Sequence, residues 1–288
     1  MKTIEALRET SWFIYQYTNL SQRESRIEAE EILKFVLGVD KPKLYSNIKT
    51  DIAKNIHERI QNILIQRKNQ IPLSYILKKH TFYKYDFYVD ENVLIPRTET
   101  ENAINEILIR GDDVFEEKKR CVFLDAGCGS GCVGISIANE RPNWKIILSD
   151  LHITSLKIAK KNLELCQHNN IDIICGDWLR PFMEETFDFI FSNPPYIVKN
   201  DSRVERSVIL HEPHTALFSD QGGLKDIEDI IKLSSKALSP SGVLMLENGI
   251  DQSWEVRKLL ESYDFTDILI HLDYNGHERF TSSRKNNG

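Results

Sequence analysis

The sequence predicts an α/β protein, with a doubly wound and mostly parallel sheet preceded by a small helical bundle. Before about residue 70 the apolar residues recur at helical spacing, whereas from residue 98 onward short apolar runs alternate with helical stretches. Strands separated by helices imply a parallel sheet with helices on both faces. The length of 288 residues suits one catalytic domain and a smaller second one.

Composition and charge indicate a globular protein whose main partner is not nucleic acid. Apolar residues make up 41% of the chain and charged residues 28%, so a sizeable core can form. The formal net charge is -6, whereas proteins that grip duplex nucleic acid usually present a basic face to the phosphates. We therefore expect no direct nucleic-acid partner.

The cysteines and the first residues predict a cytoplasmic protein without a membrane or metal partner. The start of the chain lacks the apolar core of a signal peptide, and no apolar run approaches the roughly 20 residues of a membrane span. The five cysteines include no Cys-x-x-Cys pair. His211 and His214 flank Glu212 and Pro213 without the pattern of a zinc site, so we expect a loop over the substrate pocket there.

Residues 1–71 are predicted to form a bundle of helices. Ser21, with Glu24 three residues later, is the capping-box signature that opens a helix, and Gly38 is the residue type that ends one. Asp51 is expected to cap the next helix, in which isoleucines recur at helical spacing. The bundle forms the first predicted domain.

Residues 72–97 are predicted to be a linker with a short β-hairpin, and residues 98–288 to form the second domain. Pro72 interrupts the helical pattern of the bundle. The stretch 81–89 is rich in aromatic residues that alternate with polar ones, as is typical of strands. After residue 98 the pattern changes to alternating helices and strands.

The second domain is predicted to contain seven strands and the helices between them. A helix is expected over 98–110, before the first buried strand, and a glycine-rich turn follows that strand. The expected strands, in chain order, lie at 122–124, 146–148, 171–175, 187–192 and 243–247, with two more near Ile268 and Phe280.

A glycine-rich loop follows the first strand of this sheet and opens a helix. Glycines at this place let the backbone turn sharply and approach a ligand, and ligands of such sheets lie at the carboxyl ends of the strands. The loop alone fits NAD, FAD, S-adenosylmethionine or only a tight turn. Its candidate cofactor contacts are Gly127, Cys128, Gly129, Ser130 and Gly131.

Carboxylates near the loop favour S-adenosylmethionine over a dinucleotide. Asp150 ends the second strand, where it can accept hydrogen bonds from both ribose hydroxyls or simply cap a helix. Asp125, just before the glycines, would repel a pyrophosphate but attract the cationic methionine portion. At the end of the third strand, Asp177 can approach the adenine amine, and Trp178 can stack on the ring or pack in the core.

The segment Asn193-Pro194-Pro195-Tyr196 leaves the fourth strand beside the expected cofactor. Two acceptors, the Asn193 side-chain oxygen and the Pro194 carbonyl, can hold the two N–H groups of a planar amide or amine. Such bonds orient the nitrogen for attack on a sulfonium methyl group. Pro195 stiffens the loop, and Tyr196 can lie against the substrate. We therefore predict Asn193 and Pro194 as catalytic and all four residues as substrate-binding, with a plain proline-rich turn as the alternative.

Together these motifs resemble the class I methyltransferases and, within them, the HemK/PrmC family of protein glutamine N5-methyltransferases. The resemblance covers nearly the whole chain. Its most diagnostic part is 93–101, which reads Val-Leu-Ile-Pro-Arg-Thr-Glu-Thr-Glu, with Thr98 in place of the usual proline. It also includes the linker residues 72–77, the Glu-Pro pair at 212–213 and the segment 273–279.

The resemblance implies a fold, a reaction and a partner. The reaction is methyl transfer from S-adenosylmethionine to the N5 amide of the glutamine in the Gly-Gly-Gln loop of peptide chain release factors. Asn193 would also contact the cofactor, and the helices of 1–71 would help to dock the release factor. Two alternatives stay open, namely methylation of an exocyclic amine of DNA or RNA and methylation of a glutamine in another protein, such as a ribosomal protein.

Overall fold

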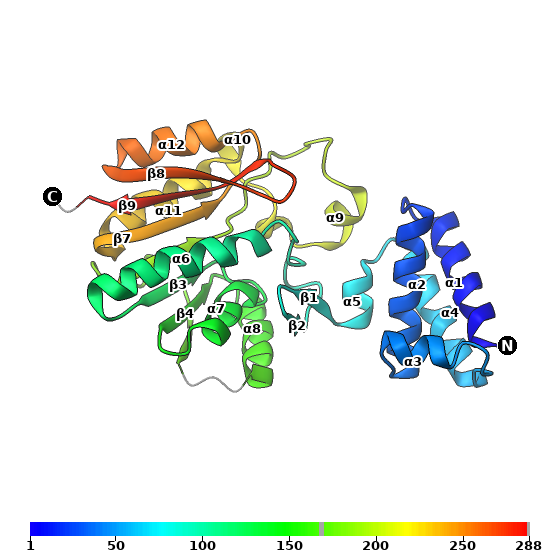
Figure 1. Ribbon diagram of the computed structural model, residues 1–288. Coiled ribbons are helices and arrows are strands. Elements are labelled where there is room, and N and C mark those ends of the chain that lie inside the picture. Colours follow the sequence, from blue (N-terminus) through cyan, green and yellow to red (C-terminus); the bar gives the residue numbers. More distant parts are fainter. Residues whose placement is uncertain (167–169, 287–288) are drawn as a thin grey trace. The chain divides into compact units, whose positions relative to one another are not determined.

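The computed structural model describes residues 1–166 and 170–286, which fold into two compact units (Figure 1). The first unit comprises Met1–Lys79 together with Glu205–His211, and the second comprises His80–Val204 and Glu212–Gly288. The stretch 72–97 is thus divided between the two units, with residues up to Lys79 in the first and residues from His80 in the second.

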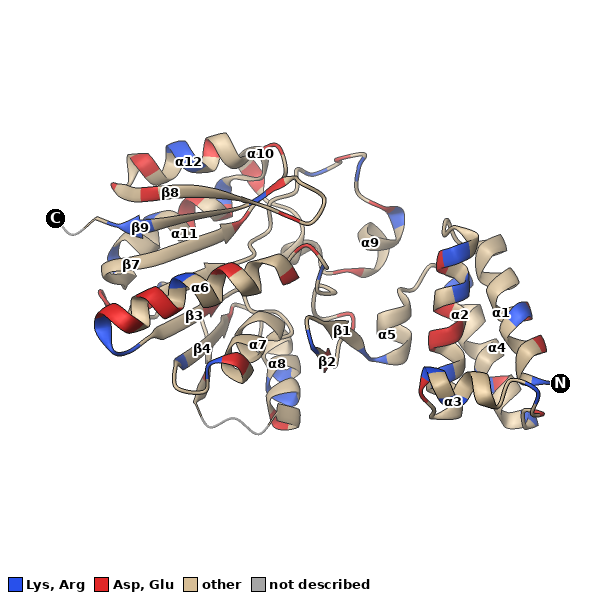
Figure 2. Ribbon diagram, in the orientation of Figure 1, with Lys and Arg blue, Asp and Glu red and all other residues tan. Residues whose placement is uncertain are grey.

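The first unit is a bundle of helices around an aliphatic core. Its helices are α1 (Thr3–Tyr17), α2 (Gln22–Leu37), α3 (Lys41–Ser46), α4 (Lys54–Lys68), α5 (Leu73–Leu77) and α9 (Arg206–His211). The capping box is confirmed, because the Ser21 hydroxyl accepts from the Glu24 N–H and the Glu24 carboxylate accepts from the Ser21 N–H. α2 ends at Leu37 and is capped by Gly38, whose φ of 64° is left-handed; both acidic and basic residues lie along the helix (Figure 2).

The prediction that Asp51 caps the following helix is wrong. α4 begins at Lys54, with Ala53 in the capping position. Asp51 instead forms an isolated antiparallel bridge with Lys2. The flanking Ile52 N–H donates to the Met1 carbonyl at 3.0 Å. A backbone pairing between distant parts of the chain therefore replaces the local capping bond that aspartate would otherwise make.

The predicted hairpin is confirmed and belongs to the core of the second unit. β1 (His80–Phe82) pairs antiparallel with β2 (Tyr85–Phe87). The rings of Phe82 and Phe87 meet edge to face with centroids 6.2 Å apart, and both are buried among residues of the large sheet and its helices. The hairpin therefore anchors the start of the second unit.

The second unit is built on a seven-stranded sheet, so the predicted strand number and mostly parallel arrangement are confirmed. The strands are β3 (Val122–Ala126), β4 (Lys145–Asp150), β5 (Ile171–Cys175), β6 (Phe187–Ser192), β7 (Leu238–Glu247), β8 (Phe265–Leu272) and β9 (Glu278–Lys285). Their order is β5-β4-β3-β6-β7-β9-β8, with β9 antiparallel to both neighbours and the other pairs parallel. The order reverses between β3 and β6, which places a ligand crevice at the carboxyl ends of these strands.

Two layers of helices cover the two faces of this sheet (Figure 1). α6 (Glu101–Lys118), α7 (Cys132–Glu140) and α8 (Ile153–Cys166) share one apolar cluster with alternate strand residues such as Phe123. α11 (Lys225–Ala237) and α12 (Ser253–Ser262) share a second cluster with the intervening residues such as Leu124. Successive strand residues face opposite layers, so most residues of β3 and β6 are apolar, and all except Val122 are buried.

The predicted helix at 98–110 is displaced and longer than expected. α6 begins at Glu101 and continues through Gly111 to Lys118. Glycine weakens a helix, so helix propensity alone favours an end before Gly111. A Cβ at Gly111 would lie 2.1 Å from the Trp144 ring, so the glycine is there to let the helix pack against that side chain. Tertiary packing, rather than helix propensity, explains this residue.

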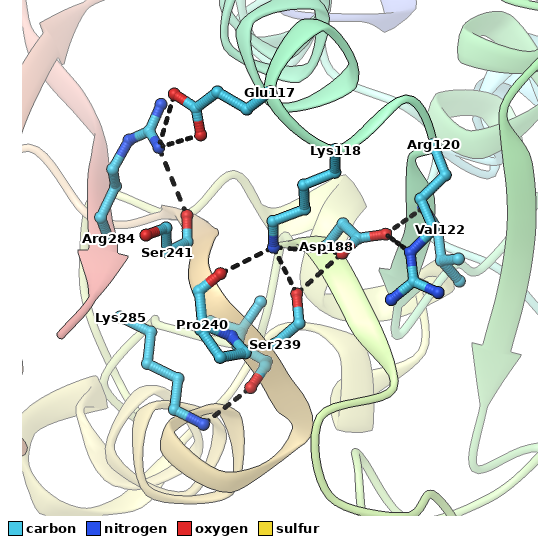
Figure 3. A network of polar contacts seen from close by, with 11 residues as sticks. Glu117, Lys118, Arg120, Val122, Asp188, Ser239, Pro240, Ser241, Arg284 and Lys285 are labelled. Carbon is cyan, nitrogen blue, oxygen red and sulfur yellow. Dashed lines mark hydrogen bonds and ion pairs between the residues drawn. The ribbon is translucent and has the colours of Figure 1, made fainter. Parts of the chain in front are cut away.

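A buried carboxylate ties together the amino-terminal ends of three strands (Figure 3). Asp188, near the start of β6, accepts from the Val122 N–H at 3.0 Å and from the Ser239 hydroxyl at 2.7 Å. The Lys118 ammonium lies 3.2 Å from the same carboxylate and also donates to the Pro240 carbonyl at 2.7 Å. This network lies at the end of the sheet opposite the crevice, so we assign it to stability.

Candidate active site

A cavity of about 630 Å³ opens at the carboxyl ends of β3, β4, β5 and β6. Its volume is within the range of small-molecule sites. The predicted site residues that line it are Asp125, Gly127, Cys128, Gly129, Ser130, Asp150, Asp177, Trp178, Asn193 and Pro195. Gly131, Pro194 and Tyr196 are not among the described residues that line it. The structure thus brings segments from four strands to one place.

The glycine loop is shaped by a close contact with Trp178. Gly127 has a φ of 74°, and a Cβ there would lie 2.9 Å from the Trp178 ring. Both facts exclude a larger residue without strain. The N–H groups of Gly127 and Cys128 donate to the Ser149 carbonyl of β4 at 2.8 and 2.9 Å. Gly131, with a φ of 78°, occupies the capping position of α7 instead of facing the cavity.

Two buried carboxylates, Asp125 and Asp150, border the cavity. Asp125 accepts from the Gly134 N–H at 2.9 Å, and burial raises its pKa to about 7, more than that hydrogen bond lowers it. Asp150 accepts from the Gly129 N–H at 3.0 Å and from the His152 N–H at 2.8 Å, and burial raises its pKa as well. Each Asp150 oxygen keeps capacity for one more donor, such as a hydroxyl group.

Asp177 and Trp178 follow β5 at the other side of the cavity. The Asp177 carboxylate pairs with the Arg180 guanidinium, with Nε 2.7 Å from Oδ2, and both residues line the cavity. Trp178 adopts a left-handed φ of 48°, which is uncommon for an aromatic residue. This conformation places its ring against Gly127. The ring therefore packs on the loop and faces the cavity at the same time.

The Asn-Pro-Pro-Tyr segment leaves β6 at the cavity. The Asn193 amide nitrogen donates to the Thr100 hydroxyl at 3.2 Å. The Tyr196 hydroxyl donates to Glu247 at 3.0 Å, so its polar end is turned to a buried carboxylate. Burial raises the pKa of the Tyr196 phenol, and the nearby Glu247 charge raises it further. The phenol stays neutral and remains a donor.

Thr100 and Glu247 are polar residues of this site that the sequence analysis missed. Their side chains are buried and joined by a hydrogen bond of 2.7 Å from the Thr100 hydroxyl to the Glu247 carboxylate. Burial raises the pKa of Glu247 to about 7, against the hydrogen bonds from Thr100 and Tyr196 and the charge of Arg279, which lower it. Glu247 is the last residue of β7, and a carboxylate at the carboxyl end of a parallel strand was the available signal.

The segment after His211 lies at the cavity, as predicted for this loop. Pro213, Thr215, Ala216 and Phe218 line the cavity. The buried Glu212 carboxylate holds the segment, because it accepts from the Ile95 N–H at 3.1 Å and from Arg97 at 2.9 Å. The diagnostic 93–101 stretch and the Glu-Pro pair are therefore parts of one wall.

Within residues 1–166 and 170–286, no group of three or more His, Cys, Asp or Glu side chains is arranged to hold a metal ion. A search of the same residues finds no helix with the length and apolar character of a membrane span.

Family models match both units of the chain. Residues 12–77 match the PrmC N-terminal domain, and residues 107–225 match the Methyltransferase small domain. The first match covers most of the helical bundle. The second extends from α6 through the glycine loop and the Asn-Pro-Pro-Tyr segment.

Curated relatives match along nearly their whole length. A release factor glutamine methyltransferase of Francisella tularensis is 34% identical over 89% of this chain and 89% of its own. Enzymes with the same name match from Buchnera aphidicola of Schizaphis graminum, at 32% identity over 95% and 98%, and from Escherichia coli K12, at 30% over 95% and 97%.

Solved structures share the fold at low sequence identity. A methyltransferase from Pyrococcus furiosus superposes with a TM-score of 0.51 at 17% identity, covering 78% of this chain and 98% of its own. The catalytic domain of hMettl16 superposes with a TM-score of 0.53 at 17% identity, covering 70% and 76%. These two likenesses show that the chain has a methyltransferase fold.

Proposed function

Since the chain belongs to the family of release factor glutamine methyltransferases, we propose that it methylates the side-chain amide nitrogen of a glutamine in a peptide chain release factor. The enzyme uses S-adenosylmethionine, which supplies a methyl group on a positively charged sulfur. The substrate glutamine is that of the Gly-Gly-Gln loop. Because a release factor acts in translation, the proposed place of action is the cytoplasm.

The cavity fits S-adenosylmethionine in shape and in the kinds of groups it presents. Asp150 has oxygen capacity left for the ribose hydroxyls, and the backbone of Gly127 to Gly131 lies beside it. Trp178 offers a ring face to the adenine, with Asp177 near its amine. Asp125 provides negative charge for the cationic portion of the cofactor.

The Asn-Pro-Pro-Tyr segment is proposed to hold the glutamine amide. The Asn193 side-chain oxygen and the Pro194 carbonyl would each accept one N–H of the amide, which directs its nitrogen to the methyl group. Bound S-adenosylmethionine would supply the methyl group: the nitrogen would bond to the methyl carbon as the carbon–sulfur bond breaks with its electrons left on sulfur, and one N–H proton would pass to water. Both acceptors stabilise the positive charge that develops on nitrogen.

One observation carries this proposal. Asn193, which is proposed to hold the substrate, and Asp150, the last residue of β4 and a proposed cofactor contact, line the same cavity, although they are 43 residues apart in the sequence. A cofactor and an amide bound by these residues would lie within one enclosed space, as transfer between them requires.

The helical bundle is proposed to contribute to binding the release factor. Residues 12–77 match the PrmC N-terminal domain, and a curated release factor glutamine methyltransferase aligns with 95% of the chain, most of the bundle included. Three of the exposed aromatic residues of the bundle, Trp12, Tyr15 and Tyr17, belong to α1 and offer contact area of the type found in protein interfaces.

Labelled S-adenosylmethionine tests the substrate directly. The purified protein should transfer label to a release factor and not to a copy in which the glutamine of the Gly-Gly-Gln loop is replaced by alanine. Label on both proteins, or on neither, would contradict the assignment. Label on DNA, RNA or a ribosomal protein instead would identify a different substrate.

Replacement of Asn193 by alanine tests the role of the side chain. Asn193→Ala removes one of two acceptors for the amide, and we expect kcat to fall by about 100-fold or more. The affinity for S-adenosylmethionine, measured by calorimetric titration, should stay close to that of the wild type. Equal turnover by wild type and variant would remove Asn193 from the chemistry.

A further inference from the structure

We propose that Thr100 and Glu247 are positioning residues that determine which end of the Asn193 side-chain amide faces the substrate. The inference rests on the proposed methylation of an amide nitrogen. It concerns residues outside the Asn-Pro-Pro-Tyr segment, which reach it from the start of α6 and the end of β7.

The contacts form a chain of three polar groups. The Asn193 amide nitrogen lies 3.2 Å from the Thr100 hydroxyl, and that hydroxyl lies 2.7 Å from the Glu247 carboxylate. Thr100 is 3% exposed and Glu247 is 1% exposed, so water does not compete for these bonds. The three residues come from distant parts of the sequence and meet through the fold alone.

The chemistry of the groups gives this chain a direction. In its ionised form Glu247 has no hydrogen to donate, so it can only accept from Thr100. A hydroxyl carries a single hydrogen, which Thr100 donates to Glu247, and it must therefore accept from Asn193. The end of Asn193 that donates is its NH2 group. Its oxygen is left directed away from Thr100, as an acceptor for the substrate.

The same carboxylate also fixes the other end of the segment. The Tyr196 hydroxyl donates to the second oxygen of Glu247 at 3.0 Å. Glu247 thus holds Asn193 through Thr100 and holds Tyr196 directly, with the two prolines between them. The Pro194 carbonyl, the second proposed acceptor, belongs to a backbone held at both ends. Burial raises the pKa of Glu247 to about 7, whereas the hydrogen bonds from Thr100 and Tyr196 and the charge of Arg279 favour the ionised form, in which both oxygens accept.

Without the Thr100 hydroxyl as acceptor, the Asn193 side chain could present its NH2 group to the substrate in place of its oxygen. If Thr100 no longer accepts a hydrogen bond, the Asn193 amide is free to rotate by half a turn about its last side-chain bond. An NH2 group would then face the NH2 group of the substrate, and the two donors cannot bond. Binding of the cofactor by the glycine loop and Asp150 does not depend on this rotation.

Isosteric variants separate this role from a structural one. Thr100→Val keeps the shape and removes the hydroxyl, and Thr100→Ser restores it. Glu247→Gln keeps the size but gives one end a donor. With the release factor as substrate, we expect Thr100→Val and Glu247→Gln to lower kcat about 10- to 100-fold, as misplacement of a reacting group does. Thr100→Ser should recover most of kcat, and Thr266→Val, an exposed position of β8 away from the cavity, should match the wild type.

Two further measurements accompany the kinetics, namely the dissociation constant for S-adenosylmethionine and the melting temperature. Both should stay near the wild-type values in Thr100→Val and Glu247→Gln. Three outcomes would overturn the inference. The first is a wild-type kcat in these two variants, and the second is a fall in kcat accompanied by lost cofactor affinity or lost stability. The third is a Thr100→Ser variant as slow as Thr100→Val. A wild-type enzyme that leaves the release factor unlabelled would instead overturn the proposed function, so the two failures are distinct.

Discussion

Asp125 combines a buried carboxyl group with a place beside the proposed cationic part of the cofactor. Burial raises its pKa to about 7, so the group is largely protonated at pH 6 and largely ionised at pH 8 when no ligand is bound. A bound cation favours the ionised form. Ligand affinity must therefore rise with pH while the group of the free protein is still protonated, and must level off once it is ionised.

We expect the affinity for S-adenosylmethionine to increase between pH 6 and pH 7, by at most about tenfold per pH unit, and to become constant above pH 8. The measurement is calorimetric titration at each pH. Asp125→Asn keeps an acceptor for the Gly134 N–H but cannot ionise, so its affinity should be lower at pH 8 and should vary less with pH. A parallel pH dependence in both proteins would exclude Asp125 as the titrating group.

At the scale of elements, the wall beside the cavity depends on Glu212. Its buried carboxylate accepts from the Ile95 N–H and from Arg97, and so joins the segment that follows α9 to the stretch that precedes α6. Loss of a hydrogen bond between charged groups costs about 1.5–3 kcal/mol in general. We expect Glu212→Ala to lower the free energy of unfolding of the second unit by about this amount and to raise KM for the release factor.

Urea unfolding and steady-state kinetics test this expectation. The exposed Glu184→Ala is the matched control, because it removes the same side chain without a described partner. Its unfolding midpoint and KM should remain those of the wild type. If Glu212→Ala behaves like this control, the carboxylate does not hold the wall.

Some elements could be predicted from the sequence because their signals are local. β5 and β6 begin and end at the predicted residues, because each is rich in apolar residues and is followed by turn-forming ones, Gly176 after β5 and two prolines soon after β6. The short helices α3 and α9 span six residues each, too few for a helical period to be recognised. β7 begins at Leu238, five residues before the prediction, because Pro240, Ser241 and Gly242 resemble a turn.

The residues of the candidate site could be predicted where a sequence motif lies at the end of a predicted strand. Asp125, Asp150 and Asn193 were identified because each follows an apolar strand whose end had been recognised. Glu247 ends a predicted strand as Asp150 does, but this signal was not used. Thr100 was missed because its significance lies in a contact with Glu247, 147 positions further along the chain. No local pattern reports such a contact. The role of Gly111 was missed for the same reason, since its partner Trp144 belongs to another element.

At the scale of the whole molecule, the stabilising and catalytic ends of the sheet are separate. Asp188 lies near the start of β6, and Asn193 follows the end of the same strand. The two residues are five positions apart, which is about 17 Å in an extended chain. We expect Asp188→Ala to lower the free energy of unfolding by on the order of 3 kcal/mol, because Lys118 loses a buried partner. Methyl transfer at low temperature, where the variant stays folded, should remain near the wild-type rate.

Tryptophan fluorescence during urea unfolding measures this effect, since Trp144, Trp178 and Trp254 belong to the second unit. Asp172→Asn removes the exposed ion pair with Lys145 and should change the midpoint little, as exposed pairs contribute about 0–1 kcal/mol. Equal midpoints for Asp188→Ala and Asp172→Asn would show that the buried network is not a main source of stability.

The short segment Glu205–His211 clusters with the first unit, although the chain on both sides of it belongs to the second. The polypeptide therefore passes from one unit to the other three times. An enzyme that begins at His80 would keep these seven residues but lose the helices with which they cluster. A fragment of residues 1–79 would lack α9. The two units therefore cannot be exchanged between relatives by a gene fusion with a single junction.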